Sequence, residues 1–277
     1  MSEPKKSDAT LPLSGRVALV TGGGRGIGRA ISLGLAEDGA DVAVNYRRDE
    51  AAAKETVSAI EAMGRRAVAY KASVDSSEED RAMVEAVRAD LGPVGILVCN
   101  AGIASRGNTV ADTDPAEFER VVRTHGFSAF YLCNLVLPEM RQQSRGDVVM
   151  ISSAATLLMA PNSVPYNVGK AALEAIAFTL AKEEFRHGIH VNVVAPGLVV
   201  TEMGRRLAKA ALGVEDPTTL DATAPFGRVC RPEDVAAVVR FLVGDQAGYV
   251  TGQRIYVDGG LAGMPPPVPR EARREKR

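Results

Sequence analysis

Residues 17–48 read VALVTGGGRGIGRAISLGLAEDGADVAVNYRR, and this stretch decides the fold. The opening apolar run at 17–21 is typical of a buried strand, and a glycine-rich turn separates it from a helical pattern at 27–38. A second β-branched run follows at 42–45. Strand, helix and strand in this order predict a βαβ unit, whose two strands lie parallel in one sheet.

The same alternation continues along the chain. Further strands are predicted at 67–71, 96–99, 148–152, 191–195 and 255–257, and further helices at 50–63, 78–90, 115–142, 165–185 and 232–242. Several strands are apolar throughout, as expected where helices cover both faces of a sheet. The sequence therefore predicts an α/β fold: a single Rossmann-like, doubly wound domain with a seven-stranded parallel sheet and helices on both faces.

No composition shift or long polar linker divides the chain, so one domain is predicted over residues 14–263. Residues 1–13 are expected to form a flexible N-terminal segment. Residues 264–277 are rich in proline and arginine and are expected to form a flexible tail, with a docking segment for an acidic partner as the alternative.

Charge and cysteine content exclude several classes of protein. The 277 residues carry a formal net charge of −1, which gives no global field to attract nucleic acid or anionic membrane. Cys99, Cys133 and Cys230 lie far apart, which favours a reducing compartment and gives no metal-ligand spacing. No signal peptide or apolar run of about 18 residues is present. We expect a cytoplasmic protein without a nucleic-acid, membrane or metal partner.

The turn Thr21-Gly22-Gly23-Gly24-Arg25-Gly26-Ile27-Gly28 stands between strand and helix, where glycines bring the backbone close to a pyrophosphate. It lacks the P-loop pattern, which favours a dinucleotide over a hydrolysed nucleotide. The second strand ends in Asn45-Tyr46-Arg47-Arg48, with no carboxylate there to bind an NAD ribose. Arginines suit a 2′-phosphate, so NADP(H) is favoured; a merely solvated arginine loop is the alternative.

Tyr166 and Lys170 are four positions apart at the start of a helical pattern, so both project from one face. A neighbouring ammonium stabilises the phenolate and so lowers the pKa of the tyrosine, which suits it to general acid/base catalysis. Ser152 and Ser153 end a predicted strand upstream, at the sheet edge where ligands gather.

These motifs occur together with Asn100-Ala101-Gly102, Pro196-Gly197-Leu198-Val199-Val200-Thr201 and Val257-Asp258-Gly259-Gly260. In their order and spacing the chain resembles the short-chain dehydrogenase/reductase family from about Leu13 to Gly260, and within it the 3-oxoacyl-carrier-protein reductase type. The resemblance implies hydride transfer between nicotinamide and a carbonyl or alcohol carbon, in a homotetramer built on the helices at 115–142 and 165–185.

The resemblance also implies roles for residues. Tyr166 would exchange the proton, Ser153 would orient the substrate oxygen, and Lys170 would lower the tyrosine pKa and bind the nicotinamide ribose. The positions expected to bind cofactor are Thr21, Gly22, Gly24, Arg25, Gly26, Ile27, Gly28, Asn45, Tyr46, Arg47, Ser73, Val74, Asn100, Ala101, Gly102, Tyr166, Lys170, Pro196, Gly197, Val199 and Thr201.

Three positions depart from the family pattern. Cys99 replaces an asparagine at a strand end, where we expect it to pack as a small apolar side chain. Ser73 replaces an aspartate beside the adenine, so contacts there would rest on the backbone at Val74. His125 replaces the asparagine of the proton relay, and we expect the imidazole to serve in its place; the alternative is that it only fills a helix kink.

Residues 202–226 form the longest interruption and are expected to be a mobile lid over the substrate. Their apolar side chains favour a largely apolar ketone, a 3-oxoacyl thioester among them, reduced to a secondary alcohol or formed in reverse. Two other functions stay open: a non-catalytic NADP(H)-binding regulator, and a sugar oxidoreductase similar to glucose dehydrogenases.

Overall fold

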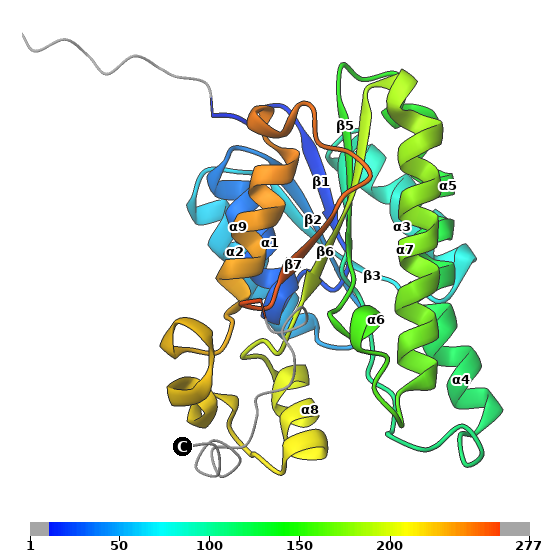
Figure 1. Cartoon of the computed structure of the whole chain (residues 1–277). Helices are drawn as coiled ribbons and strands as arrows, with labels where there is room; N and C mark the ends of the chain where they lie inside the picture. The colour runs from blue at the N-terminus through cyan, green and yellow to red at the C-terminus, as the bar shows by residue number, and fades with distance from the viewer. Residues whose placement is uncertain (1–10, 261–277) are drawn as a thin grey trace, which may run out of the picture.

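The computed structural model describes residues 11–260. Seven parallel strands form one sheet in the order β3-β2-β1-β4-β5-β6-β7 (Figure 1). The strands are β1 (Val17–Val20), β2 (Asp41–Tyr46), β3 (Ala67–Lys71), β4 (Val94–Cys99), β5 (Gly146–Ile151), β6 (Ile189–Pro196) and β7 (Arg254–Val257). The predicted doubly wound, seven-stranded sheet is confirmed. The N-terminal and C-terminal segments predicted to be flexible lie largely outside the described residues.

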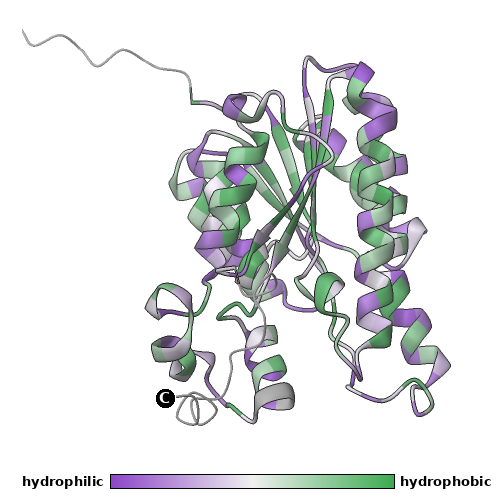
Figure 2. Ribbon diagram, in the orientation of Figure 1, coloured by the Kyte–Doolittle hydropathy of each residue, from purple (hydrophilic) through white to green (hydrophobic). Residues whose placement is uncertain are grey.

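Helices cover both faces of the sheet (Figure 1). One layer holds α1 (Gly26–Glu37), α2 (Glu50–Ala62) and α9 (Pro232–Val243); the other holds α3 (Ser77–Asp90), α4 (Pro115–Val122), α5 (Ser128–Met140) and α7 (Val164–Glu184). Apolar colouring is concentrated on the strands and on the helix faces against them (Figure 2). In β4, Leu97 packs into the core under α3 and α5, whereas Ile96 and Val98 pack into the core under α1 and α9. Burial on both faces explains the uninterrupted apolar runs.

The structure differs from the sequence prediction in two helical regions. The predicted helix at 115–142 is interrupted by a π-helical turn, Arg123–Phe127, between α4 and α5. The predicted interruption at 202–226 is itself largely helical: it contains α8 (Glu202–Leu212) and short 3₁₀ turns at Pro217–Thr223 and Pro225–Gly227. Within the described part of the chain, no helix is long and apolar enough to cross a membrane.

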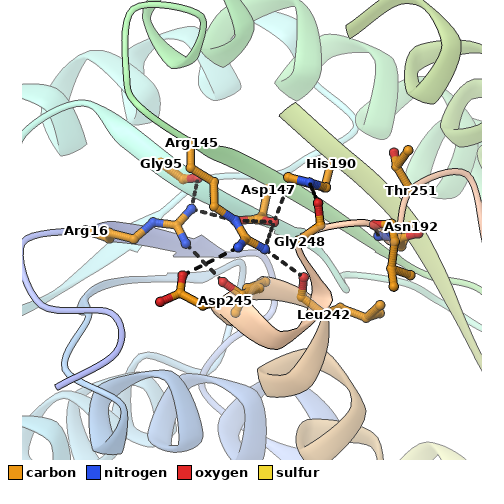
Figure 3. A network of polar contacts seen from close by, with 12 residues as sticks. Arg16, Gly95, Arg145, Asp147, His190, Asn192, Leu242, Asp245, Gly248 and Thr251 are labelled. Atoms are coloured by element: carbon orange, nitrogen blue, oxygen red, sulfur yellow. Dashed lines mark hydrogen bonds and ion pairs between the residues drawn. The ribbon is translucent and has the colours of Figure 1, made fainter. Parts of the chain in front are cut away.

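A polar network fastens the amino ends of the central strands (Figure 3). Asp147 on β5 is buried and accepts hydrogen bonds from Arg16 at 2.7 Å and from Arg145 at 3.0 Å. Arg16 also donates to the carbonyl oxygens of Gly95 and Val243, which joins β4 and the end of α9 to β5. Because two guanidinium groups offset the charge of the buried carboxylate, the network holds β4, β5 and the end of α9 together at the amino ends of the strands.

Candidate active site

A cleft of about 800 Å³ opens at the carboxyl ends of the strands. The strand order changes direction between β1 and β4, and this is where open α/β sheets form a crevice. Every residue predicted for catalysis or cofactor binding lines the cleft, apart from Thr21, which is buried beneath the glycine turn. The fold therefore brings the glycine turn and the Ser153, Tyr166 and Lys170 set into one site.

The glycine turn leaves its backbone open to a ligand. Gly22 and Gly26 have φ angles of +60° and +54°, in the left-handed region that favours glycine. A Cβ atom on Gly28 would lie 2.1 Å from the carbonyl oxygen of Gly22, so α1 can begin directly against the turn only with glycine there. Backbone N–H groups at the start of a helix, with no side chains over them, fit the pyrophosphate of a dinucleotide.

Three of the predicted cofactor-binding side chains brace this turn. The Thr21 hydroxyl oxygen accepts hydrogen bonds from the N–H groups of Asn100 and Ala101, both at 2.9 Å. The Asn100 amide donates to the Thr21 carbonyl oxygen at 2.8 Å. Asn45 accepts from the Gly22 N–H at 3.1 Å and donates to the Ala72 carbonyl oxygen at 3.1 Å. These polar groups fix the shape of the turn between the ends of β1, β2, β3 and β4.

The three arginines at the cofactor end differ in their partners. Arg25 forms an ion pair of 2.7 Å with Glu202, the first residue of α8. Arg47 and Arg48 line the cleft and are exposed, and neither has an ion-pair partner within residues 11–260. The nearest carboxylate in sequence, Asp49, caps α2 by accepting from the Ala52 N–H at 3.1 Å. The end of β2 therefore presents positive charge to the cleft.

Ser73 lies at the predicted adenine position, and its polar groups are used within the protein. Its hydroxyl donates to the Asp75 carboxylate at 2.5 Å, and its N–H donates to Glu79 at 2.8 Å. Val74 lines the cleft beside it. The expectation that adenine contacts rest on the backbone at Val74 stays a prediction.

The nicotinamide end of the predicted site lies between β6 and α8. Pro196, Gly197, Val199 and Thr201 all line the cleft. The Thr201 hydroxyl accepts from the Gly204 N–H at 2.9 Å and so caps the first turn of α8. The loop that is expected to hold the nicotinamide therefore also fixes the start of the lid helix.

The catalytic candidates lie on β5 and α7. Tyr166 and Lys170 occupy the first two turns of α7, on the face toward the cleft, and Ser153 follows β5. The Lys170 ammonium donates to the Ile151 carbonyl oxygen at 2.7 Å, and Nζ lies 5.8 Å from the centroid of the Tyr166 ring. One helix and one strand end thus bring a phenol, an ammonium and a hydroxyl together.

Burial controls the proton affinities of these groups. Burial raises the pKa of Tyr166, and a hydrogen bond with the Ser153 hydroxyl acts in the opposite direction. The expected lowering of this pKa by Lys170 is not seen in this arrangement, because burial outweighs the other effects. Burial lowers the pKa of Lys170 to about 8, and the nearby Cys99 and Glu174 act to raise it. At neutral pH the pair is therefore a phenol beside an ammonium.

His125 lies in the π-helical turn and contacts Tyr166. Its ring packs edge-on against Tyr166, with 5.2 Å between centroids. Nε2 lies 2.8 Å from the Ile103 carbonyl oxygen and 3.3 Å from the Ile103 nitrogen, so it donates to the carbonyl in one tautomer and accepts from the N–H in the other. Nδ1 is buried and has no hydrogen-bond partner among the described residues. Burial, and then the Lys170 charge, lower the pKa of His125 well below its usual value, so the imidazole is neutral.

A Cβ atom on Gly102 would lie 2.4 Å from the His125 ring, so the glycine after β4 makes room for the imidazole. Cys99 lies three residues earlier, at the end of β4. It is buried in the core under α3 and α5, as expected of a small apolar side chain.

Sequence reasoning missed Glu174, a buried carboxylate one turn beyond Lys170. It accepts a hydrogen bond from the Ser152 hydroxyl at 2.5 Å, so Ser152 is directed to this carboxylate, whereas the Ser153 hydroxyl hydrogen-bonds Tyr166. The available signal was its position: a glutamate four residues after Lys170, in an otherwise apolar stretch of helix, shares the face of the catalytic pair.

A dinucleotide cleft with a tyrosine, lysine and serine at its base defines a nicotinamide-dependent oxidoreductase. The family model described as enoyl-(acyl carrier protein) reductase matches residues 22–262. The chain belongs to the short-chain dehydrogenase/reductase family and is an oxidoreductase of carbonyl and alcohol groups.

Curated relatives of different activity match almost the full length of the chain. A 3-oxoacyl-[acyl-carrier-protein] reductase of Staphylococcus aureus is 36% identical, over 88% of this chain and 97% of the relative. An L-rhamnose 1-dehydrogenase (NAD(P)(+)) of a Sphingomonas species is 34% identical, over 90% and 97%. The solved structure of a short-chain type dehydrogenase/reductase from Mycobacterium marinum superposes with a TM-score of 0.81 at 30% identity, covering 91% of this chain and 97% of that one.

Proposed function

We propose that this protein uses NADP(H) to reduce a largely apolar ketone, such as a 3-oxoacyl thioester, to a secondary alcohol, or to catalyse the reverse reaction. The observation that carries the proposal is the convergence of Ser153, Tyr166 and Lys170 at the base of the cleft that also holds the glycine turn. The cofactor supplies or accepts the hydride when bound. The residues of the chain supply the proton and the positioning.

Ser153 and Tyr166 act on the substrate oxygen. The Ser153 hydroxyl hydrogen-bonds that oxygen and places it beside the phenol, where developing negative charge needs a donor. Tyr166 donates its proton to the oxygen during reduction and takes it back during oxidation. The Lys170 ammonium stabilises the phenolate that remains, and its pKa of about 8 keeps it protonated at neutral pH.

The preference for NADP(H) rests on Arg47 and Arg48. Both face the cleft without an ion-pair partner in the described part of the chain, and together they outnumber the adjacent carboxylate of Asp49, which also lines the cleft and caps α2. Arg25 is already paired with Glu202, which makes it the weaker candidate. A 2′-phosphate would form charge-assisted hydrogen bonds with an unpaired guanidinium.

The lid favours an apolar substrate. Met203 and Leu207 on α8 line the cleft and are more than one-third exposed, and Ile103 lines it after β4. The likeness to an L-rhamnose dehydrogenase keeps a sugar as the second candidate substrate. A sugar would need hydrogen-bonding groups where these apolar side chains lie. Turnover of apolar ketones but not of sugars would therefore distinguish the two candidate substrate classes.

We test the proposal by following NADPH and NADH oxidation with acyl thioesters, apolar ketones, quinones, aldehydes and sugars. We expect turnover of apolar ketones with NADPH, and a loss of about 10²–10⁴-fold in kcat for Tyr166→Phe. Tyr249→Phe, at an exposed tyrosine far from the cleft, is the matched control.

Arg47→Ser should remove about tenfold or more of the NADPH preference over NADH, and Arg25→Ser should remove less. Tight NADPH binding without turnover of any carbonyl would instead favour the non-catalytic regulator, and sugar turnover alone would favour the sugar oxidoreductase.

We also propose that the chain assembles as a homotetramer through the outer faces of α5 and α7. Phe130 on α5 and Val168 on α7 are exposed, as are Phe127, just before α5, and Phe185, just after α7.

A further inference from the structure

Glu174 is a buried carboxylate in contact with three polar side chains from separate elements. It is 5% exposed. Oε1 accepts from the Ser152 hydroxyl at 2.5 Å and from the Thr156 hydroxyl at 2.8 Å, and Oε2 accepts from Arg254 at 2.7 Å. Every polar atom of the carboxylate is therefore used, and its charge is matched by one guanidinium.

These contacts tie the catalytic groups to one another. Ser152 directly precedes Ser153 at the end of β5, and Thr156 lies in α6 (Ala155–Leu158), the short helix that follows. Lys170 lies one turn before Glu174 on α7 and donates to Ile151, also at the end of β5. The backbone that carries Ser153 is thus held between the lysine and the glutamate of one helix.

The charge of Glu174 acts on Lys170. The ionisable groups that face Lys170 are Tyr166 and Glu174 on α7, Cys99 at the end of β4 and His125 in the π-helical turn. Burial lowers the pKa of Lys170, whereas Glu174 and Cys99 act to raise it. Arg254, on β7, donates to Oε2 of Glu174 and offsets part of its charge.

We propose that Glu174 is a positioning residue of the reaction: it fixes the turn that carries Ser153 and supplies the negative charge that holds Lys170 as an ammonium. The inference rests on the proposed function, because it assigns Glu174 a part in that same site. Glu174 touches neither substrate nor cofactor and acts only through Ser152 and Lys170.

The chain offers a matched control on the same helix. Glu184, near the end of α7, is also buried and accepts hydrogen bonds from Arg141 at 2.5 and 2.9 Å. It is absent from the lining of the cleft. Glu184→Gln therefore removes a buried ion pair from α7 without touching the catalytic groups.

The first experiment compares pH profiles of kcat for wild type, Glu174→Gln, Glu174→Asp and Glu184→Gln, each checked for folding by circular dichroism. Lys170 loses its function as pH rises through its pKa. A lower lysine pKa therefore moves the alkaline limb to lower pH. We expect the alkaline limb of Glu174→Gln to lie about one pH unit lower than that of wild type. Glu174→Asp keeps the charge and should return the limb to its wild-type position. Glu184→Gln should leave the limb where it is in wild type.

Arg254→Gln gives a test of opposite sign, and it covers the case in which Glu174→Gln does not fold. Without the guanidinium, the charge of Glu174 acts on Lys170 uncompensated, so the alkaline limb should move to higher pH. A general loosening of the site would not move the alkaline limb to lower pH in Glu174→Gln and to higher pH in Arg254→Gln.

A second measurement does not depend on turnover. The ¹³Cε signal of Lys170, assigned through Lys170→Arg, is titrated by NMR in wild type, Glu174→Gln and Glu184→Gln. A lower Lys170 pKa in Glu174→Gln alone supports the inference even if no substrate is found and the proposed function fails. An unchanged Lys170 pKa in a folded Glu174→Gln protein, or an equal shift in Glu184→Gln, overturns it.

Discussion

Asp80 is a buried carboxylate without a counter-ion. Asp147, Glu174 and Glu184 each face an arginine, but Asp80 is 0% exposed and neither of its oxygen atoms has a hydrogen-bond partner among the described residues. Burial, and then the charges of Asp75 and Glu79, raise its pKa to about 8. The folded protein therefore holds Asp80 protonated at neutral pH.

This residue makes stability depend on pH. The unfolded chain releases the Asp80 proton near pH 4, whereas the folded chain keeps it up to about pH 8. The contribution of Asp80 to the free energy of unfolding is therefore fully present below the unfolded pKa and is lost as pH rises between these values. We expect Asp80→Asn to reduce the difference in unfolding free energy between pH 5 and pH 8.5 by on the order of 2–4 kcal/mol. Urea unfolding of wild type and Asp80→Asn at both pH values measures this difference in unfolding free energy.

The neighbouring Glu78→Gln, at an exposed residue of the same helix turn, is the control and should leave that difference unchanged. An Asp80→Asn protein with the pH dependence of wild type would show that Asp80 is ionised in the fold.

Single residues differ in how far the sequence could predict them. Tyr166 and Lys170 were predictable, because a four-residue spacing on a helix fixes a shared face. Glu174 was not, because a glutamate is ordinarily solvent-exposed and its partner Arg254 lies 80 residues away on another element. The pairing of Arg25 with Glu202 spans 177 residues and depends on where α8 is placed, which local sequence does not encode.

At the scale of elements, the π-helical turn between α4 and α5 explains the position of His125. The Thr124 hydroxyl donates to the Arg120 carbonyl oxygen at 2.8 Å, and the Ser128 hydroxyl donates to the Thr124 carbonyl oxygen at 2.6 Å. These hydrogen bonds give partners to backbone carbonyl groups at the place where the α-helical hydrogen-bond pattern changes to the π-helical one. The turn places the imidazole against Tyr166, which is compatible both with a relay and with filling of the bend.

Two substitutions of His125 separate these two roles. Because asparagine is the relay residue that the family resemblance implies, the informative variant is His125→Leu, which fills the bend but cannot pass a proton. If the buried imidazole relays protons, we expect a fall of about tenfold in kcat for His125→Leu and a smaller effect for His125→Asn. Because burial holds the pKa of His125 well below 6.5, the wild-type profile should show no acid limb from it. His190→Asn, in the network at the opposite end of the sheet, is the control. A folded His125→Leu protein with the wild-type rate would remove the relay.

The helix α8 was predictable in part. Thr201 before it and Gly213 after it, with φ at +68°, are an N-cap and a C-terminal glycine that mark its bounds. The expectation that residues 202–226 interrupt the helical pattern was therefore wrong for α8. Its role as a lid stays a prediction.

At the scale of the molecule, the outer helix layer leaves apolar surface exposed. Phe130, on α5, is 56% exposed, and Phe127 and Phe185 are exposed to a similar degree. The adjacent Tyr131 packs edge-on against both Phe127 and Phe130. Clustered aromatic side chains on one outer face are typical of protein interfaces, and a second copy of the chain would bury them under rotational symmetry.

We therefore expect the wild-type protein to have four times the mass of the 29.2 kDa chain in light scattering coupled to size exclusion. Phe130→Asp places a charge in the proposed interface, where it would be desolvated without a partner, so it should shift the mass to that of a dimer or monomer. Val110→Asp, at an exposed loop residue, should leave the mass unchanged. If Phe130→Asp keeps the wild-type mass while remaining folded, α5 does not form the interface, and the exposed aromatic side chains need another explanation.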